Sequence, residues 1–208
     1  MNILEIYDAL FSRYGDLNWW PANSAYEVIV GAVLTQNTNW GNVEKAIANF
    51  DNLTPEFVRD AEISEISEII KPSGFFNQKA VYLKAVTAWF EKYNFDVSAV
   101  RLQPLERLRP EILAVKGIGK ETADSILLYA FGFPTFVIDA YTARLCSRYP
   151  VDAGNGYDAL KLHFETNIQN SEIYNNFHAM IVMNAKEHCR KKPLCNNCPL
   201  NAGCRKII

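Results

Sequence analysis

The sequence predicts an all-α protein with a metal-binding loop at its C-terminal end. Apolar residues recur at three- and four-residue spacing along most of the 208-residue chain, which is the period of a helix with one buried face. No segment has the alternation and the turn of a strand hairpin. Four of the five cysteines fall within the last twenty residues, a clustering that favours metal over disulfides in an intracellular protein.

Composition predicts a soluble cytoplasmic protein that has no membrane partner. Apolar residues make up 49% of the chain, enough for a sizeable core. The longest apolar stretches, such as residues 28–34, are too short to span a bilayer, and residues 1–11 lack the basic start of a signal peptide. The net charge is −2, but residues 186–208 include six basic residues and one acid, so this segment carries +5 and the remainder −7. A basic end fits a nucleic-acid contact and a solvated tail equally well.

Periodicity and helix breakers place the elements in order. Ser24, with Glu27 three residues later, is a good N-cap for the second helix. Polar turns are expected at residues 36–39 and 71–74, and Pro110 is expected to separate two short helices. The helices are expected over residues 3–14, 24–36, 43–50, 54–59, 63–70, 78–93, 104–108, 110–115, 121–131, 140–149, 157–168 and 172–188.

The run from Leu113 to Ala123 is the most informative segment. Gly117-Ile118-Gly119 lies between a short apolar approach and a helix start, and so predicts a tight hairpin between two helices. Glycine permits backbone angles closed to other residues and lets a phosphate approach, while free N–H groups at a helix start favour an anion. Such a hairpin can hold a nucleic-acid backbone without reading its sequence, although a simple helix–helix turn would also explain the glycines.

The residues that follow extend this pattern. Gly132-Phe133-Pro134 precede Val137-Ile138-Asp139, and the next helix carries Arg144 and Arg148. The run resembles the helix-hairpin-helix, Gly/Pro-rich loop and aspartate of the HhH-GPD glycosylases of the endonuclease III superfamily, and the resemblance covers nearly the whole chain. It implies a monomeric base-excision repair enzyme, nucleoid-associated in the cytoplasm, that binds double-stranded DNA containing a damaged base. The DNA contacts implied at the hairpin are Lys116, Gly117, Gly119, Lys120 and Thr122.

The resemblance also implies a two-lobed fold. A six-helix barrel domain with the helix-hairpin-helix is expected over residues 22–134. The second lobe is expected to join residues 1–21 to residues 135–208 and to carry an iron–sulfur cluster. DNA is expected to lie across the cleft between the lobes.

Asp139 is implied to be the catalytic carboxylate. Base excision passes through an oxocarbenium-like sugar, and a nearby carboxylate stabilises that charge and helps deliver water. The competing interpretation is that Asp139 only caps the helix after it. A non-catalytic DNA-binding protein built on the same hairpin is the corresponding alternative function, and Asp139→Asn separates the two.

A missing lysine narrows the chemistry that the resemblance implies. Bifunctional members of the family carry a lysine just before Thr-Ala, where it attacks the sugar as an amine and leads to strand cleavage. Glu121 occupies that position here, and Lys120 should point about 100° away around the helix. The sequence therefore predicts a monofunctional glycosylase that leaves the abasic site intact. The alternatives are a glycosylase with lyase activity on oxidised pyrimidines, in which Lys120 serves as the amine, and a monofunctional enzyme for mismatched thymine or uracil.

The expected substrate is an alkylated purine such as 3-methyladenine, because residues 117–124 look like the branch that excises it. That branch also has a Trp-Trp-Pro run and a helix that ends in Leu-Thr-Gln-Asn-Thr, matched here by residues 19–21 and 34–38. Aromatic faces attract an electron-poor, cationic base, and its weak glycosidic bond needs little beyond flipping, stacking and one carboxylate. The expected base pocket comprises Trp19, Trp20, Pro21, Trp40 and Glu121. Core packing is the alternative for the tryptophans.

Three further residues are expected to meet the DNA. Gln36 and Asn37 lie in the turn that fills the gap left by the flipped base in relatives, with a helix C-cap as the alternative. Phe75 resembles the position that wedges into the opposite strand, with a buried core ring as the alternative. No histidine lies in the motif region, so no acid is expected to protonate the base; the three are His163, His178 and His188.

The cysteines Cys189, Cys195, Cys198 and Cys204 are spaced with gaps of five, two and five residues. A single Cys-x-x-Cys pair flanked by single cysteines suits a cubane cluster, whereas zinc ribbons usually show two such pairs. The resemblance implies a structural [4Fe–4S] cluster. The first gap is usually six residues in relatives and is five here. This difference affects the expected shape of the loop and not the number of ligands. Cys146 is expected to pack as a small apolar side chain.

Overall fold

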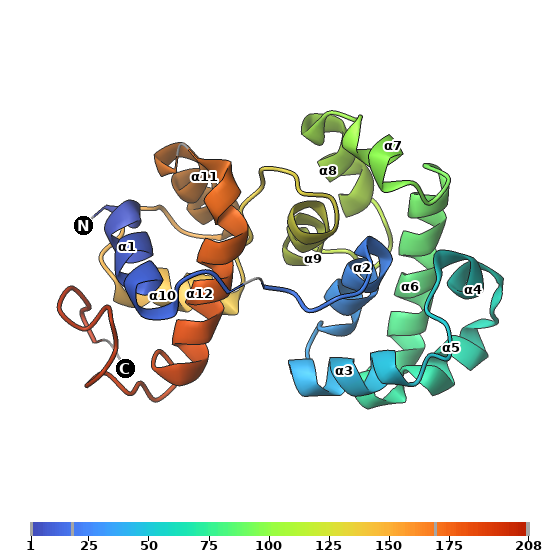
Figure 1. The fold of residues 1–208 in the computed structure, drawn as a ribbon, viewed down its shortest axis with the longest axis horizontal. Coiled ribbons are helices and arrows are strands. Elements are labelled where there is room, and N and C mark those ends of the chain that lie inside the picture. The colour runs from blue at the N-terminus through green and yellow to red at the C-terminus, as the bar shows by residue number, and fades with distance from the viewer. Residues whose placement is uncertain (1, 18, 169, 207–208) are drawn as a thin grey trace. The chain divides into compact units, whose positions relative to one another are not determined.

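A computed structural model describes residues 2–17, 19–168 and 170–206. The described residues form α-helices, short 3-10 and π turns and loops, with no β-strand among them (Figure 1). The predicted all-α class is confirmed. Within these ranges, no helix is both long enough and apolar enough to cross a bilayer.

The chain divides into two compact units. Residues Ala22–Phe133 form one, the continuous unit, and the segments Met1–Pro21 and Pro134–Ile208 form the other, the discontinuous unit. The division falls one residue before the expected limit at residue 134. Each unit has its own apolar core.

The continuous unit is built around α2, which is buried from Val28 to Leu34 and packs against α6 and η2. Trp89, Phe90 and Phe131 form its aromatic centre, with ring centroids 5.7–6.4 Å apart. The described residues of this unit contain eight α-helices, including the short α4 and α7, rather than the six of the barrel that the resemblance implies. The elements are α2 (Ala25–Leu34), α3 (Trp40–Ala48), α4 (Pro55–Asp60), α5 (Ile63–Ile69), η1 (Lys71–Ser73), α6 (Phe76–Glu91), α7 (Val97–Arg101), α8 (Leu105–Leu113), α9 (Lys120–Ser125) and η2 (Ile126–Ala130).

The discontinuous unit is centred on α12, which packs against both α1 and α10. The rings of Phe136, Phe164 and Phe177 meet in its core, with Phe136 stacked on Phe164 at 4.2 Å. The loop that carries four cysteines follows α12. The elements are α1 (Ile3–Tyr14), α10 (Ala140–Arg148), α11 (Tyr157–Asn167), η3 (Ser171–Ile173) and α12 (Tyr174–Glu187).

Three expected helices differ from the structure. Pro110 lies inside the single helix α8 and does not separate two helices. Proline removes one backbone hydrogen bond, but Leu108 and Ile112 remain buried on one face, and this packing holds the helix together. The helix expected over 121–131 is α-helical only to Ser125 and continues as the π turn η2, whose consecutive buried residues pack against α2. The short helix α7 was not expected at all.

Candidate functional site

Asp139 is held at the N-terminus of α10, in the discontinuous unit. Its Oδ1 accepts a hydrogen bond from the Thr142 amide at 2.7 Å, so it is the N-cap of the helix. His178 Nε2, from α12, lies 3.5 Å from Asp139 Oδ2, and both side chains are largely buried. Burial by itself raises the pKa of Asp139, but the neighbouring His178 and the bond from Thr142 outweigh it, and the pKa falls below its usual value. The site therefore presents an ionised carboxylate at neutral pH.

His178 is a neighbour that sequence reasoning missed. It lies thirty-nine positions from Asp139 in the sequence, so no local motif joins the two. His178 therefore lies against the carboxylate although it is outside the motif region of the sequence.

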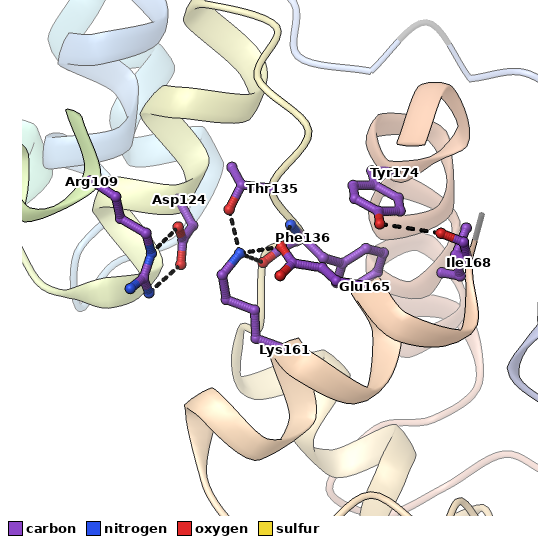
Figure 2. A network of polar contacts seen from close by, with 8 residues as sticks. All are labelled: Arg109, Asp124, Thr135, Phe136, Lys161, Glu165, Ile168 and Tyr174. Atoms are coloured by element: carbon purple, nitrogen blue, oxygen red, sulfur yellow. Dashed lines mark hydrogen bonds and ion pairs between the residues drawn. The ribbon is translucent and has the colours of Figure 1, made fainter. Parts of the chain in front are cut away.

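The segment before Asp139 is fixed by a polar network on α11. The Phe136 amide donates to Glu165 Oε1 at 2.8 Å, and Lys161 Nζ contacts Glu165 and the hydroxyl of Thr135. Figure 2 shows the Lys161 ammonium between these partners. Residues 135–138 are all buried, so the chain enters α10 from a rigid support. Such support preorganises the carboxylate without help from a ligand.

The predicted hairpin joins α8 to α9 in the continuous unit. Gly117 has a positive φ of 83°, while Gly119 has extended backbone and N-caps α9. Behind the hairpin, Arg109 on α8 donates twice to Asp124 on α9, at 2.8 and 3.0 Å (Figure 2). Lys116 and Lys120 are exposed beside it, and Thr122 is buried. The Arg109–Asp124 ion pair thus joins the two helices of the hairpin.

Gly117→Ala is expected to destabilise the protein by about 1–3 kcal/mol, because a left-handed backbone disfavours a side chain. A Cβ at Gly117 would lie 2.1 Å from Cδ1 of Tyr82, so that ring would also have to move. The matched control is Gly119→Ala, where φ is −90° and an added Cβ meets nothing within 4 Å of the described atoms. Urea unfolding and duplex binding measure both variants. Equal stability of the two would contradict the expectation.

The tryptophans expected at the base pocket lie in different units. Trp19, Trp20 and Pro21 end the first segment of the discontinuous unit, whereas Trp40 begins α3 and Glu121 lies in the first turn of α9. All three tryptophans are half-buried, whereas Trp89 is fully buried in the core of the continuous unit.

The Trp19-Trp20 pair has a distinctive local setting. Lys186 Nζ lies 5.3 Å from the Trp19 ring centroid, a cation–π distance. Trp20 has a positive φ of 76°, which is strained for a bulky side chain. Strain of this kind persists only where the surroundings impose it, and it is common at functional sites.

The turn after α2 is tied to the hairpin. Gln36 Nε2 donates to the Gly117 carbonyl and to Thr122 Oγ1, each at 3.0 Å. Its amide is thus engaged within the protein, while Asn37 is exposed at the tip with a positive φ of 54°. Phe75 is 64% exposed, so the alternative of a buried ring is wrong.

The four clustered cysteines are free thiols in one loop region. Burial raises the pKa of Cys198, and the charges of the other three cysteines raise it further, so each of these three sulfurs lies within electrostatic range of Cys198. The Arg148 guanidinium lies 3.3 Å from Cys189 Sγ, and the Lys206 amide 3.4 Å from Cys204 Sγ. In the described ranges, no group of three or more His, Cys, Asp or Glu side chains is arranged as a finished metal site. Four thiols with N–H donors to sulfur nevertheless form the donor set that a cubane cluster requires.

Two arginines of α10 hold this loop, a role that the sequence did not indicate. Arg144 Nε donates to the Cys189 carbonyl at 2.7 Å. Arg148 is buried and donates to the carbonyls of Arg190 and Lys191 at 2.7 and 3.1 Å. Cys146, on the same helix, lies apart, and burial raises the pKa of its thiol to about 12, as suits an inert packing residue.

Known proteins resemble the chain over most of its length. Residues 30–170 match the family model described as HhH-GPD superfamily base excision DNA repair protein. A Methanocaldococcus jannaschii protein, provisionally named a DNA repair glycosylase, is 47% identical over 209 residues, covering 97% of this chain and 95% of that protein. Endonuclease III of Sulfolobus acidocaldarius is 26% identical over 190 residues, covering 89% and 83%.

Solved structures share the fold. The 3-methyladenine DNA glycosylase of H. pylori, bound to 1,N6-ethenoadenine, matches with a TM-score of 0.79 at 29% identity, covering 90% of this chain and 98% of that one. A trapped endonuclease III–DNA covalent intermediate matches with a TM-score of 0.83 at 22% identity, covering 99% of this chain and 97% of that one. At this identity the match shows a shared fold alone. The chain therefore belongs to the HhH-GPD superfamily of base excision DNA repair glycosylases.

Proposed function

We propose that this glycosylase is monofunctional and hydrolyses the N-glycosidic bond of alkylated purines such as 3-methyladenine. The observation that carries the proposal is Glu121, in the first turn of α9, where bifunctional relatives place the lysine nucleophile. A carboxylate cannot form a Schiff base, so the sugar must be attacked by water. The similarity to the H. pylori 3-methyladenine glycosylase supports the choice of substrate.

Asp139 would supply the charge that this reaction needs. A 3-methylated adenine leaves as a neutral base and takes the electrons of the glycosidic bond, so no acid is required. The sugar becomes cationic as the bond breaks, and the ionised carboxylate stabilises it. Water then adds to the anomeric carbon and gives its proton to Asp139 or to solvent.

The flipped base would be bound by Trp19, Trp20, Pro21, Trp40 and Glu121. Stacking on aromatic faces favours an electron-poor ring, and a carboxylate at Glu121 favours a positive one. The strained backbone of Trp20 makes it the stronger stacking candidate of the Trp19-Trp20 pair.

The experiment is incubation with methylated duplex DNA, followed by chromatography of free bases and by gels run with and without alkali. We expect 3-methyladenine to be released, with strand breaks only after alkali. Borohydride should trap no covalent complex, and Lys120→Ala should keep its turnover within about twofold, because loss of a single phosphate contact costs little at moderate salt. Duplexes with oxidised pyrimidines, mismatched thymine or uracil test the alternatives. Direct nicking and a borohydride-trapped complex that Lys120→Ala abolishes would restore the bifunctional interpretation.

We also propose that Cys189, Cys195, Cys198 and Cys204 hold a [4Fe–4S] cluster. The cluster would cross-link the loop that Arg144 and Arg148 attach to α10, and it would keep a basic segment in place for phosphates.

Cys198→Ser is expected to lower the iron and sulfide content of the purified protein well below four per chain, because the cubane loses one corner ligand. Cys146→Ser is the matched control, since this thiol lies outside the set, and its iron content should equal that of the natural protein. Metal analysis and visible absorbance provide the measurement. Tightly bound zinc in place of iron and sulfide would contradict the cluster assignment.

A further inference from the structure

Lys79 is a buried lysine on α6, and both hydrogen-bond partners of its ammonium group lie outside that helix. Its side chain is 2% exposed, and Nζ donates to the carbonyls of Leu34 and Ser73, each at 2.7 Å. In the described part of the chain no carboxylate forms an ion pair with it. Burial lowers the pKa of Lys79 to about 8. A buried cation without an acid partner is costly unless its hydrogen bonds compensate for the lost hydration.

The positive charge of Lys79 is unfavourable for the dipole of α6 and favourable for the dipole of α2. It lies in the fourth position of α6, near the positive end of the helix dipole. Leu34 is the last residue of α2, whose final turn contains no basic residue of its own. Lys79 therefore caps the C-terminus of α2 from another helix, and satisfies a carbonyl that the helix leaves without an internal partner.

The two carbonyls that Lys79 joins lead to the two exposed tips of the continuous unit. Leu34 comes three residues before Asn37, and Ser73 comes two residues before Phe75. Asn37 and Phe75 both have left-handed backbone, with φ of 54° and 47°.

Three local features of Phe75 are energetically unfavourable. It is the N-cap of α6 and gives no side-chain cap hydrogen bond within the described structure, its backbone is left-handed, and its ring is 64% exposed. These costs indicate a contact with something outside the chain. Lys79 and Gln36 connect both tips to the hairpin, because Gln36 bonds the Gly117 carbonyl.

We propose that Lys79 is a positioning residue that fixes the separation of Asn37 and Phe75, so that both tips enter a DNA duplex together where a base is missing or flipped. The inference rests on the proposed function, since it takes these tips to be DNA-facing. The Phe75 ring can replace a lost stacking partner while Asn37 meets the exposed edge of a base only if the distance between the two residues matches the spacing of these sites in the duplex.

The experiment compares binding to two duplexes of the same sequence, one undamaged and one with a tetrahydrofuran abasic-site analogue flanked by 2-aminopurine. Lys79→Met is expected to reduce the preference for the abasic duplex by about tenfold or more, and to reduce the rise in 2-aminopurine fluorescence, because unstacking is no longer compensated. Affinity for the undamaged duplex should change by less than about twofold, since phosphate contacts persist.

Lys84→Met is the matched control. Lys84 lies on the same helix and also donates to two carbonyls, those of Arg59 and Ala61, but these lie at the end of α4. Its preference for the abasic duplex should stay at the natural value. Should Lys79→Met fail to fold, Lys79→Gln serves in its place, because it keeps a shorter donor.

A double variant separates positioning from general loss of stability. Adding Lys79→Met to Phe75→Ala should leave the preference no lower than Phe75→Ala alone, because both changes remove the same insertion. Additive losses, or a Lys79→Met preference within about twofold of the natural one, would overturn the proposal. Failure to release 3-methyladenine while this coupling holds would refute only the substrate assignment.

Discussion

Asp139→Asn is expected to lower the single-turnover rate of base release by about 10²–10³-fold, the usual cost of removing one preorganised electrostatic group. Asparagine keeps the shape of the side chain and an oxygen for the Thr142 amide, but it has no charge to set against a cationic sugar. Affinity for an abasic-site duplex should persist, because binding does not require that charge.

The variant also separates catalysis from capping. Asparagine is as good an N-cap as aspartate, so Asp139→Asn should keep the cap. It should lose only the stabilisation of the charge by His178 and the Thr142 amide, which lowers the urea midpoint slightly. Asp139→Ala is the companion variant, which removes both charge and cap and should cost a further 0.5–2 kcal/mol or so of stability. If Asp139→Asn kept the natural rate of base release, Asp139 would be a capping residue only.

Arg109→Met is expected to destabilise the protein by about 3–5 kcal/mol. The Asp124 side chain is fully buried, and Arg109 binds both its oxygens. Methionine fills much of the volume of the arginine stem but removes two charge-assisted hydrogen bonds from a buried carboxylate. Breaking a buried ion pair in this way costs more than the intact pair contributes to stability. Urea unfolding provides the free energy.

The double variant Arg109→Met with Asp124→Leu tests this cause. It removes both charges and should recover most of the lost stability, since a buried ion pair is often replaceable by apolar residues. A loss below about 1 kcal/mol in Arg109→Met alone would mean that solvent compensates Asp124, contrary to the expectation.

Local signals predicted much of the fold. Ser24 and Asp139 both accept the backbone hydrogen bonds expected of helix N-caps, and Gly117 has the positive φ that the hairpin pattern indicates. These features depend on a few neighbouring residues, so the sequence displays them directly.

Contacts between distant segments could not be predicted in this way. Gln36 bonds Gly117 and Thr122 more than eighty positions away, and His178 meets Asp139 from another helix. Periodicity shows which face of a helix is buried but not which face it meets. Pro110 failed as a helix breaker for a related reason, because burial of Leu108 and Ile112 outweighed its local preference.

The discontinuous unit has a consequence for the order in which the chain folds during translation. Tyr7 of α1 packs edge-on against Phe177 of α12, and the main helix partners of α1 in the described residues are α11 and α12. At the usual pace of synthesis, on the order of ten seconds separate the emergence of α1 from that of these partners. Residues 22–133 form a compact unit with an apolar core of its own, so this unit can fold before the partners of α1 are synthesised. The nascent chain therefore exposes the apolar face of α1 for that interval, the stage at which a chaperone has most to bind.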